Sequence, residues 1–186
     1  MSASVLDSWA MIAWLQGEEP ARSKVHELLE RATRNETKLG ISLINVGEVF
    51  YLIAKRHGAA LAERFLAELA TMPIQPLLPD RRLILNAARL KSRHPISYAD
   101  AFAVETAREQ NAVLVTGDPE LWRLSKHEPV ELLWVGEKQV HWRTLRPKHI
   151  AVAGGAVQMP DEVMLHIVVE GRHTAAQVVH LDGAKG

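Results

Sequence analysis

The sequence predicts an α/β protein, in which a central, mainly parallel sheet carries helices on both faces. Two observations lead to this prediction. Short apolar runs alternate along the chain with longer segments of helical periodicity, which is typical of parallel sheets joined by helical crossovers. The run AVLVTGD (112–118) is continuous, rich in β-branched residues and ended by turn residues, as in a buried strand. The 186 residues are also enough to build a substantial core.

Each element rests on a local signal. Val25, Leu28, Leu29 and Ala32 follow the i, i+3, i+4, i+7 pattern of an amphipathic helix, and Gly58 is a common helix end. Strands or extended segments are predicted at SVLD (4–7), LGISLI (39–44), PIQPLLP (73–79), AVLVTGD (112–118) and VELLWV (130–135). Helices are predicted at 8–17, 19–33, 45–58, 59–72, 80–93 and, for SYADAFAVETA, from residue 97 onward.

These elements occupy residues 1–136, which we interpret as one domain. Residues 137–186 have a different pattern, with two apolar pieces around Gly-Gly in IAVAGGAVQM, which is a hairpin signal. We expect a small β-rich C-terminal appendage there, with partial disorder as the alternative. Five of the nine histidines fall in it without metal-motif spacing, so no zinc site is expected.

Composition excludes several classes of protein. Lys plus Arg and Asp plus Glu number 22 each, so the net charge favours neither nucleic acid nor membrane as a partner. The chain has no cysteine, which rules out disulfides and thiolate metal sites. It shows no signal peptide and no apolar run long enough to span a bilayer, so we expect a cytoplasmic protein without membrane contact.

Four acidic residues stand out by position: Asp7 after the first strand, Glu48 near a helix start, Asp100 in the first turn of its helix, and Asp118 after the strongest strand. Each has a local explanation. Asp118 followed by Pro119 is a good helix N-cap, Asp7 or Ser8 is suited to capping the first helix, and Asp100 favours a positive helix N-terminus. Glu48 lies off the apolar stripe of its helix.

Considered together, the four acidic residues indicate a cluster at one edge of the sheet. The carboxyl ends of parallel strands meet at one edge of a sheet, where ligands of such folds collect. Carboxylates about 4 Å apart repel by roughly 4 kcal/mol per pair at an effective dielectric of 20, so a cluster must bind protons or cations. An oxygen-only ligand set suits Mg²⁺, with Mn²⁺ as a substitute, and such an ion activates water for phosphodiester hydrolysis.

The order of these residues resembles a known family. An early apolar-apolar-Asp, a mid-chain helical Glu, SYADAFAVETA and AVLVTGDPEL together are similar to the PIN-domain ribonucleases, in particular the VapC-type toxins of type II toxin–antitoxin systems. The similarity extends from residue 4 to about residue 135 and implies a PIN-like three-layer α/β/α sandwich. Residues 137–186 depart from the pattern.

The resemblance implies an Mg²⁺-dependent endoribonuclease that acts on structured RNA such as tRNA or rRNA, a cognate antitoxin protein and a homodimer. Carried over residue by residue, the catalytic and metal-binding set is Asp7, Glu48, Asp100 and Asp118. Thr116, two residues before the last Asp, matches a hydroxyl position that supports the metal ligands or orients water. In the extension, HWRTLRPKH (141–149) could bind RNA, although a tail without direct chemistry is the simpler interpretation.

Two alternatives remain. A non-catalytic PIN-fold binding or regulatory module would use the acidic pocket only for a cation or a partner. A phosphatase-like or nucleotide-binding enzyme is disfavoured, because the chain lacks the phosphate-binding glycine motifs and the second Asp that an aspartyl-phosphate enzyme needs after VLDSW.

Overall fold

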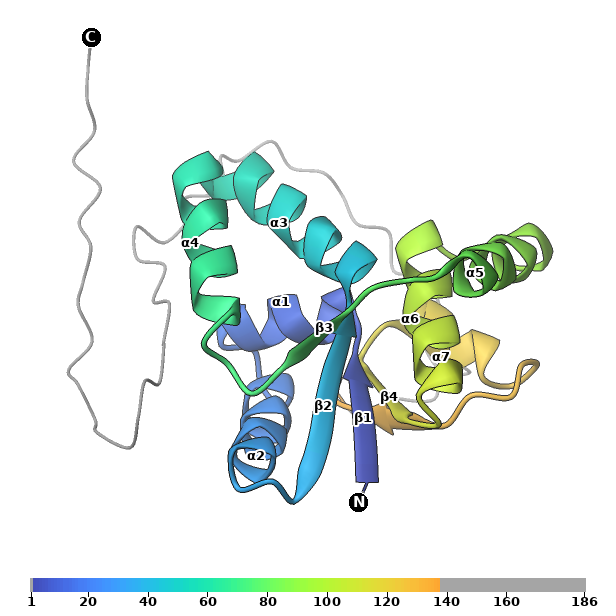
Figure 1. Ribbon diagram of the computed structural model, residues 1–186, viewed down its shortest axis with the longest axis horizontal. Helices are drawn as coiled ribbons and strands as arrows, with labels where there is room; N and C mark the ends of the chain where they lie inside the picture. Colours follow the sequence, from blue (N-terminus) through green and yellow to red (C-terminus); the bar gives the residue numbers. More distant parts are fainter. Residues whose placement is uncertain (1, 138–186) are drawn as a thin grey trace, which may run out of the picture.

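The computed structural model describes residues 2–137. Its centre is a five-stranded sheet in the order β3-β2-β1-β4-β5 with all neighbours parallel, which confirms the predicted α/β sandwich (Figure 1). The strands are β1 (Ser2–Leu6), β2 (Thr37–Ser42), β3 (Gln75–Leu77), β4 (Val113–Thr116) and β5 (Leu132–Trp134). The helices are α1 (Ser8–Gln16), α2 (Ala21–Thr33), α3 (Leu43–His57), α4 (Ala59–Leu69), α5 (Arg81–Arg93), α6 (Tyr98–Glu109) and α7 (Pro119–Leu124).

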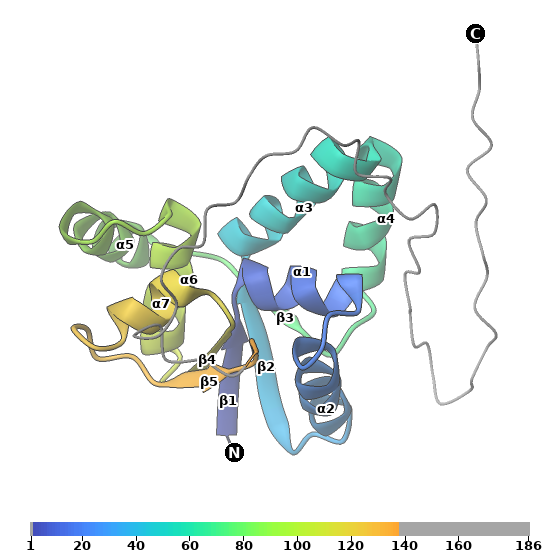
Figure 2. The ribbon, with the colours of Figure 1, turned by 180° about the vertical axis from the view of Figure 1, so that it is seen from behind.

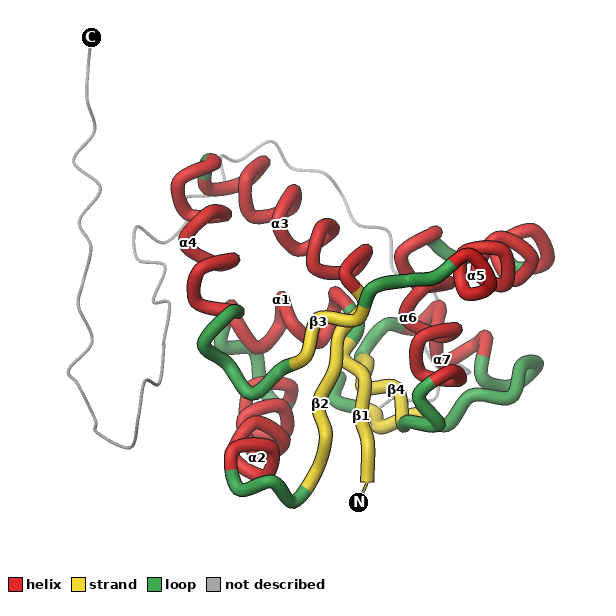
Figure 3. The backbone as a smooth tube through the Cα atoms, viewed as in Figure 1, coloured by secondary structure: helices red, strands yellow, loops and turns green. Residues whose placement is uncertain are grey.

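Successive residues of the central strands point to opposite faces, and each face has its own core. Leu6 of β1 and Val115 of β4 pack with apolar residues of α1 to α4. Val5 and Leu114, one residue earlier in the same strands, pack with α5, α6 and α7. The result is two helical layers around one sheet, visible in Figures 2 and 3 as helix groups on either side of the strands.

Five of the seven helices in residues 2–137 begin at a capping side chain, and α2 and α4 begin without one. Asp7 caps α1, Ser42 caps α3, Asp80 caps α5, Ser97 caps α6 and Asp118 caps α7, and each side chain accepts a hydrogen bond from a backbone N–H of its helix. Helix α1 begins two residues after the end of β1, and α7 begins three residues after the end of β4. Their capping residues, Asp7 and Asp118, therefore lie at the carboxyl edge of the sheet.

The predicted boundaries differ from the structure mainly at β2. We predicted a strand over 39–44, whereas β2 ends at Ser42 and Leu43 already belongs to α3. The Ser42 hydroxyl accepts a hydrogen bond from the Ile44 N–H, so a cap residue inside an apolar run ends the strand early. No helix within residues 2–137 is long and apolar enough to cross a membrane. The predicted β-rich appendage lies outside the described residues, and the division at residue 136/137 stays a prediction.

Candidate functional site

Asp7 is the most buried carboxylate of the predicted set, with 1% of its surface exposed. Its Oδ1 accepts a hydrogen bond from the Ala10 N–H at 2.7 Å, and its Oδ2 accepts one from the Thr116 hydroxyl at 2.5 Å. The pKa of Asp7 is raised to about 8, chiefly by burial; the two hydrogen bonds lower it, and the nearby carboxylates of Asp100 and Asp118 raise it. At neutral pH, Asp7 therefore holds a proton unless a cation replaces it.

Thr116 connects two of the predicted acids. Parallel pairing places β1 beside β4 with Leu6 opposite Val115, so Asp7 and Thr116 follow in adjacent positions at the end of the two strands. The buried Thr116 hydroxyl donates to Asp7 and accepts from the Asp118 N–H at 2.9 Å. One hydroxyl thus orients both the side chain of Asp7 and the backbone N–H of Asp118.

Asp118 is half-buried and caps α7, with Pro119 at the first helical position as the sequence predicted. Its Oδ1 accepts a hydrogen bond from the Glu120 N–H at 2.6 Å. Its place at the end of β4 brings its charge to the same edge of the sheet as Asp7.

Asp100 belongs to a capping box at the start of α6. Its Oδ2 accepts a hydrogen bond from the Ser97 N–H at 3.0 Å, and its own N–H donates to the Ser97 hydroxyl at 2.9 Å. Burial raises the pKa of Asp100, the Ser97 bonds lower it, and the carboxylates of Asp118 and Glu48 raise it. Asp100 therefore has a structural role, but that role does not neutralise its charge.

Glu48 lies in the second turn of α3 and is half-buried. The hydroxyl of Tyr51, one turn further on the same helix, donates to its Oε1 at 3.3 Å. Tyr51 itself is 53% exposed, so this side of α3 faces solvent rather than another element of the described chain.

We call Asp7, Glu48, Asp100 and Asp118 the acidic edge. Asp7 is coupled to Asp100 and Asp118, and Asp100 to Asp118 and Glu48, because each pair shifts a pKa. None of the four forms an ion pair with a basic side chain within residues 2–137.

A hard divalent cation fits the chemistry of this donor set, which consists of carboxylate oxygens only, and the pKa values of Asp7 and Asp100 are raised. In the described part of the chain, however, no three Asp, Glu, His or Cys side chains already form a group that could hold a metal ion. Binding by the acidic edge would thus require its side chains to move together, with Asp7 giving up the proton that it holds at neutral pH.

The sequence analysis did not single out Asn45, a fully buried residue of α3 beside this edge. Its Nδ2 donates to the Ser8 hydroxyl at 2.9 Å and to the Ala99 carbonyl at 3.2 Å, which joins the residues next to Asp7 and Asp100. Its Oδ1 has no hydrogen-bond partner in residues 2–137. The only sequence signal for a role of Asn45 was its position three residues before Glu48. This signal was weak, because an apolar residue at position 45 would also fit the helical pattern.

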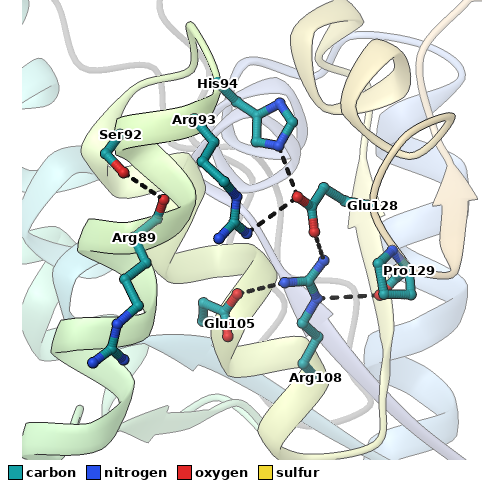
Figure 4. A network of polar contacts seen from close by, with 8 residues as sticks. All are labelled: Arg89, Ser92, Arg93, His94, Glu105, Arg108, Glu128 and Pro129. Carbon is teal, nitrogen blue, oxygen red and sulfur yellow. Dashed lines mark hydrogen bonds and ion pairs between the residues drawn. The ribbon is translucent and has the colours of Figure 1, made fainter.

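A second set of charges lies between α5, α6 and the segment after α7 (Figure 4). Glu128 accepts hydrogen bonds from Arg108 at 2.9 Å and Arg93 at 3.2 Å, and its Oε1 lies 2.7 Å from His94 Nε2. Arg108 also pairs with Glu105 at 2.5 Å. These bonds lower the pKa of Glu128 to about 2. We call these five residues the Glu128 network.

The geometry therefore defines a protein of the parallel α/β class with an edge of acidic side chains at the carboxyl ends of β1 and β4. The sequence profile of the PIN domain family matches residues 4–127, so the chain belongs to the PIN domain family. The comparison with curated proteins gives no match.

Solved structures share the fold at low sequence identity. VapBC2 from Rickettsia felis, bound to a DNA fragment from its promoter, gives a TM-score of 0.56 at 14% identity, over 72% of this chain and 98% of that chain. DNA-bound VapBC from Salmonella typhimurium gives 0.54 at 15% identity, over 72% and 98%. VapBC-1 from nontypeable Haemophilus influenzae gives 0.52 at 21% identity, over 71% and 97%. At these identities the likeness establishes the fold.

Proposed function

We propose that this protein is a metal-dependent endoribonuclease that acts as the toxin of a toxin–antitoxin pair. The observation that carries the proposal is the acidic edge: Asp7 and Asp100 have raised pKa values beside Asp118 and Glu48, with no basic side chain of the described chain to pair with them. Buried carboxylates without basic partners destabilise a fold, and a requirement for them in the activity of the protein explains why they are present.

Asp7, Glu48, Asp100 and Asp118 would hold Mg²⁺, or Mn²⁺ in its place. Such an ion, when bound, lowers the pKa of a water molecule and offsets negative charge on a phosphodiester in the transition state. The residues of the chain contribute orientation. Thr116 holds Asp7 through its hydroxyl, and Asn45 ties the N-terminus of α1 to that of α6, so that Asp7 and Asp100 remain on one edge.

The partners follow from the same proposal. We expect RNA as the substrate, with tRNA or rRNA as candidates, and a small antitoxin as inhibitor, because the structural neighbours named VapBC are two-component complexes. An apolar groove between α1, α3 and α4, with a cavity of about 50 Å³, offers a surface for a protein partner; it is lined by Ile12, Leu15, Leu52, Ile53 and Phe65 among others. We expect a homodimer and a cytoplasmic location.

The decisive experiment is incubation of structured RNA with the purified full chain, freed of any co-purified protein, with Mg²⁺ or Mn²⁺ and with chelator. We expect discrete fragments that require the metal and disappear in Asp100→Asn. The matched control is Glu63→Gln on the exposed surface of α4, which should cleave like the wild type. Metal binding measured by calorimetry provides a readout that does not depend on knowing the RNA target.

A non-catalytic binding module is the second candidate, and the capping roles of Asp7, Asp100 and Asp118 favour it, because they account for these residues without any chemistry. In that case Mg²⁺ binds to the folded protein, the heat of binding is lost in Asp100→Asn, and no RNA is cleaved. Folded protein that neither binds Mg²⁺ nor cleaves RNA would contradict both candidates.

A further inference from the structure

A pocket on the described surface is lined by two tryptophans and three glutamates. We call it the tryptophan pocket; it lies where the α1–α2 loop, the β4–α7 turn and the end of β5 meet, and its cavity is about 630 Å³. Its lining comprises Trp9, Glu18, Glu19, Ala21, Gly117, Pro119, Trp134, Gly136 and Glu137. Gly117 and Pro119 flank Asp118, so the pocket adjoins the acidic edge without containing any of its residues.

Glycines allow the two indoles to form the walls of this pocket. A Cβ atom at Gly117 would lie 2.1 Å from Cζ3 of Trp9, and one at Gly136 would lie 2.9 Å from Cζ2 of Trp134. The rings can therefore lie directly on the backbone only because both positions lack side chains. The Trp134 Nε1–H donates to the Glu137 carbonyl at 2.8 Å, which fixes this ring beside Glu137.

The side chains that line the pocket carry only negative charge, and one basic residue, Lys24, contacts the lining through the Trp134 carbonyl at 2.8 Å. Glu18, Glu19 and Glu137 form no ion pair with any basic side chain in the part of the chain that the structure describes. Indole faces attract cations, and carboxylates beside them add to that attraction. The chemistry of the pocket therefore suits a guanidinium or ammonium group and repels a phosphate.

The chain itself supplies such groups immediately after the pocket. Glu137, a lining residue, is the last described residue, and the following sequence KQVHWRTLRPK (138–148) carries Lys138, Arg143, Arg146 and Lys148 without an acidic residue. At about 3.3 Å per residue, Arg143 lies within roughly 20 Å of Glu137, so it can reach the pocket. A short tether gives such a group a local concentration of about millimolar, enough to favour a weak site.

We propose that the tryptophan pocket is the docking site for the basic segment 138–148 of this same chain, with an arginine or lysine side chain between the indoles and the carboxylates. Docking would place the segment next to Asp118, where it borders the acidic edge. The proposal does not depend on nuclease activity, because it concerns only the pocket and the segment that follows it.

The test is the rate at which trypsin cleaves the full chain after Arg143. In Glu18→Gln/Glu19→Gln, two charges are removed while the hydrogen-bond acceptors remain, including the one that Glu19 offers to the Ser23 N–H. We expect cleavage to become about three- to tenfold faster than in the wild type, the range expected for losing a partly exposed cation–π and ion-pair contact. The matched control is Glu27→Gln/Glu63→Gln, two exposed glutamates outside the pocket, which should cleave at the wild-type rate.

A second measurement changes the basic segment instead of the pocket. In Arg143→Gln/Arg146→Gln/Lys148→Gln, the indole N–H resonances of Trp9 and Trp134 should shift, whereas the Glu27→Gln/Glu63→Gln control should leave them in place. Equal cleavage rates for wild type and pocket variant, an equal acceleration in both glutamine pairs, or unmoved indole resonances would each overturn the proposal.

Discussion

Two sets of carboxylates in this domain have pKa values that are shifted in opposite directions from those of ordinary acids. In the Glu128 network, Arg93, His94 and Arg108 surround Glu128 and lower its pKa to about 2. At the acidic edge, burial and neighbouring carboxylates raise the pKa of Asp7 to about 8. Both sets use α6: Asp100 lies in its first turn and Arg108 in its last.

The comparison distinguishes a carboxylate whose ionised form stabilises the fold, Glu128, from one whose ionised form destabilises it, Asp7. Glu128 is stabilised by the basic groups that contact it, so its ionisation favours the folded state. Asp7 is buried without a basic partner in residues 2–137, so its ionisation opposes folding. An added cation should therefore stabilise the acidic edge and leave the Glu128 network unchanged.

The largest expected effect is on catalysis. In Asp100→Asn, RNA cleavage should fall by about a hundredfold or more, because loss of one metal ligand removes several kcal/mol of transition-state stabilisation. Glu128→Gln, at equal concentration of folded protein, should cleave like the wild type. Full activity in Asp100→Asn would show that the acidic edge is not the reaction centre.

The next effect is the pH dependence of stability in chelator-treated protein. The pKa of Asp7 is about 8 in the folded state and 3.8 in the unfolded chain, so the favourable contribution of its protonated form is complete below about pH 4. It is lost progressively as pH rises toward 8. In Asp7→Asn, which mimics the protonated acid, this loss should disappear, and the melting temperature at pH 8 should exceed that of the wild type by a few degrees, about 4 °C per kcal/mol.

Calorimetry checks the same group through its proton. At pH 7 Asp7 is mostly protonated, so Mg²⁺ binding should release a proton, and the binding heat should change between buffers of different ionisation enthalpy. Asp7→Asn should lose this buffer dependence. A buffer-independent heat in the wild type would contradict the raised pKa.

A smaller effect is expected on the other side of the comparison. Glu128→Gln should lower the free energy of unfolding by about 1–2 kcal/mol at pH 7, because Arg93 and Arg108 lose the charge between them. The folded pKa of about 2 lies below the unfolded value of 4.5, so the contribution of Glu128 is full above about pH 4.5 and disappears as pH falls toward 2. Urea denaturation of wild type and variant at pH 7 and pH 2.5 should show the difference shrink; an unchanged difference would assign the loss to packing.

The sequence predicted those features that depend on local order. The strand AVLVTGD, the Asp118-Pro119 helix start and the helix end at Gly17 were each visible in a few consecutive residues. The parallel sheet then placed Asp7 next to Thr116, so the acidic edge followed from topology.

The remaining contacts depend on distant residues without a periodic signal. Glu128 and His94 are 34 positions apart and each looks like an ordinary surface residue in the sequence. Asn45 stands where an apolar residue would equally fit the pattern, and its partners Ser8 and Ala99 come from two other helices. Such pairs become visible only when the helices are packed.

The smallest expected change in stability separates capping from metal binding. Asp118 and Asp80 have the same local role, since each caps a helix by accepting a backbone hydrogen bond, at 2.6 Å from Glu120 and 2.7 Å from Leu83. Asparagine caps about as well as aspartate, so Asp118→Asn and Asp80→Asn should each change the free energy of unfolding by less than about 0.5 kcal/mol. Only Asp118→Asn should weaken Mg²⁺ binding in calorimetry, because Asp80 is not part of the acidic edge. Equal Mg²⁺ affinity in the two variants would reduce Asp118 to a cap, and a marked drop in the stability of Asp118→Asn alone would show that its charge stabilises the fold.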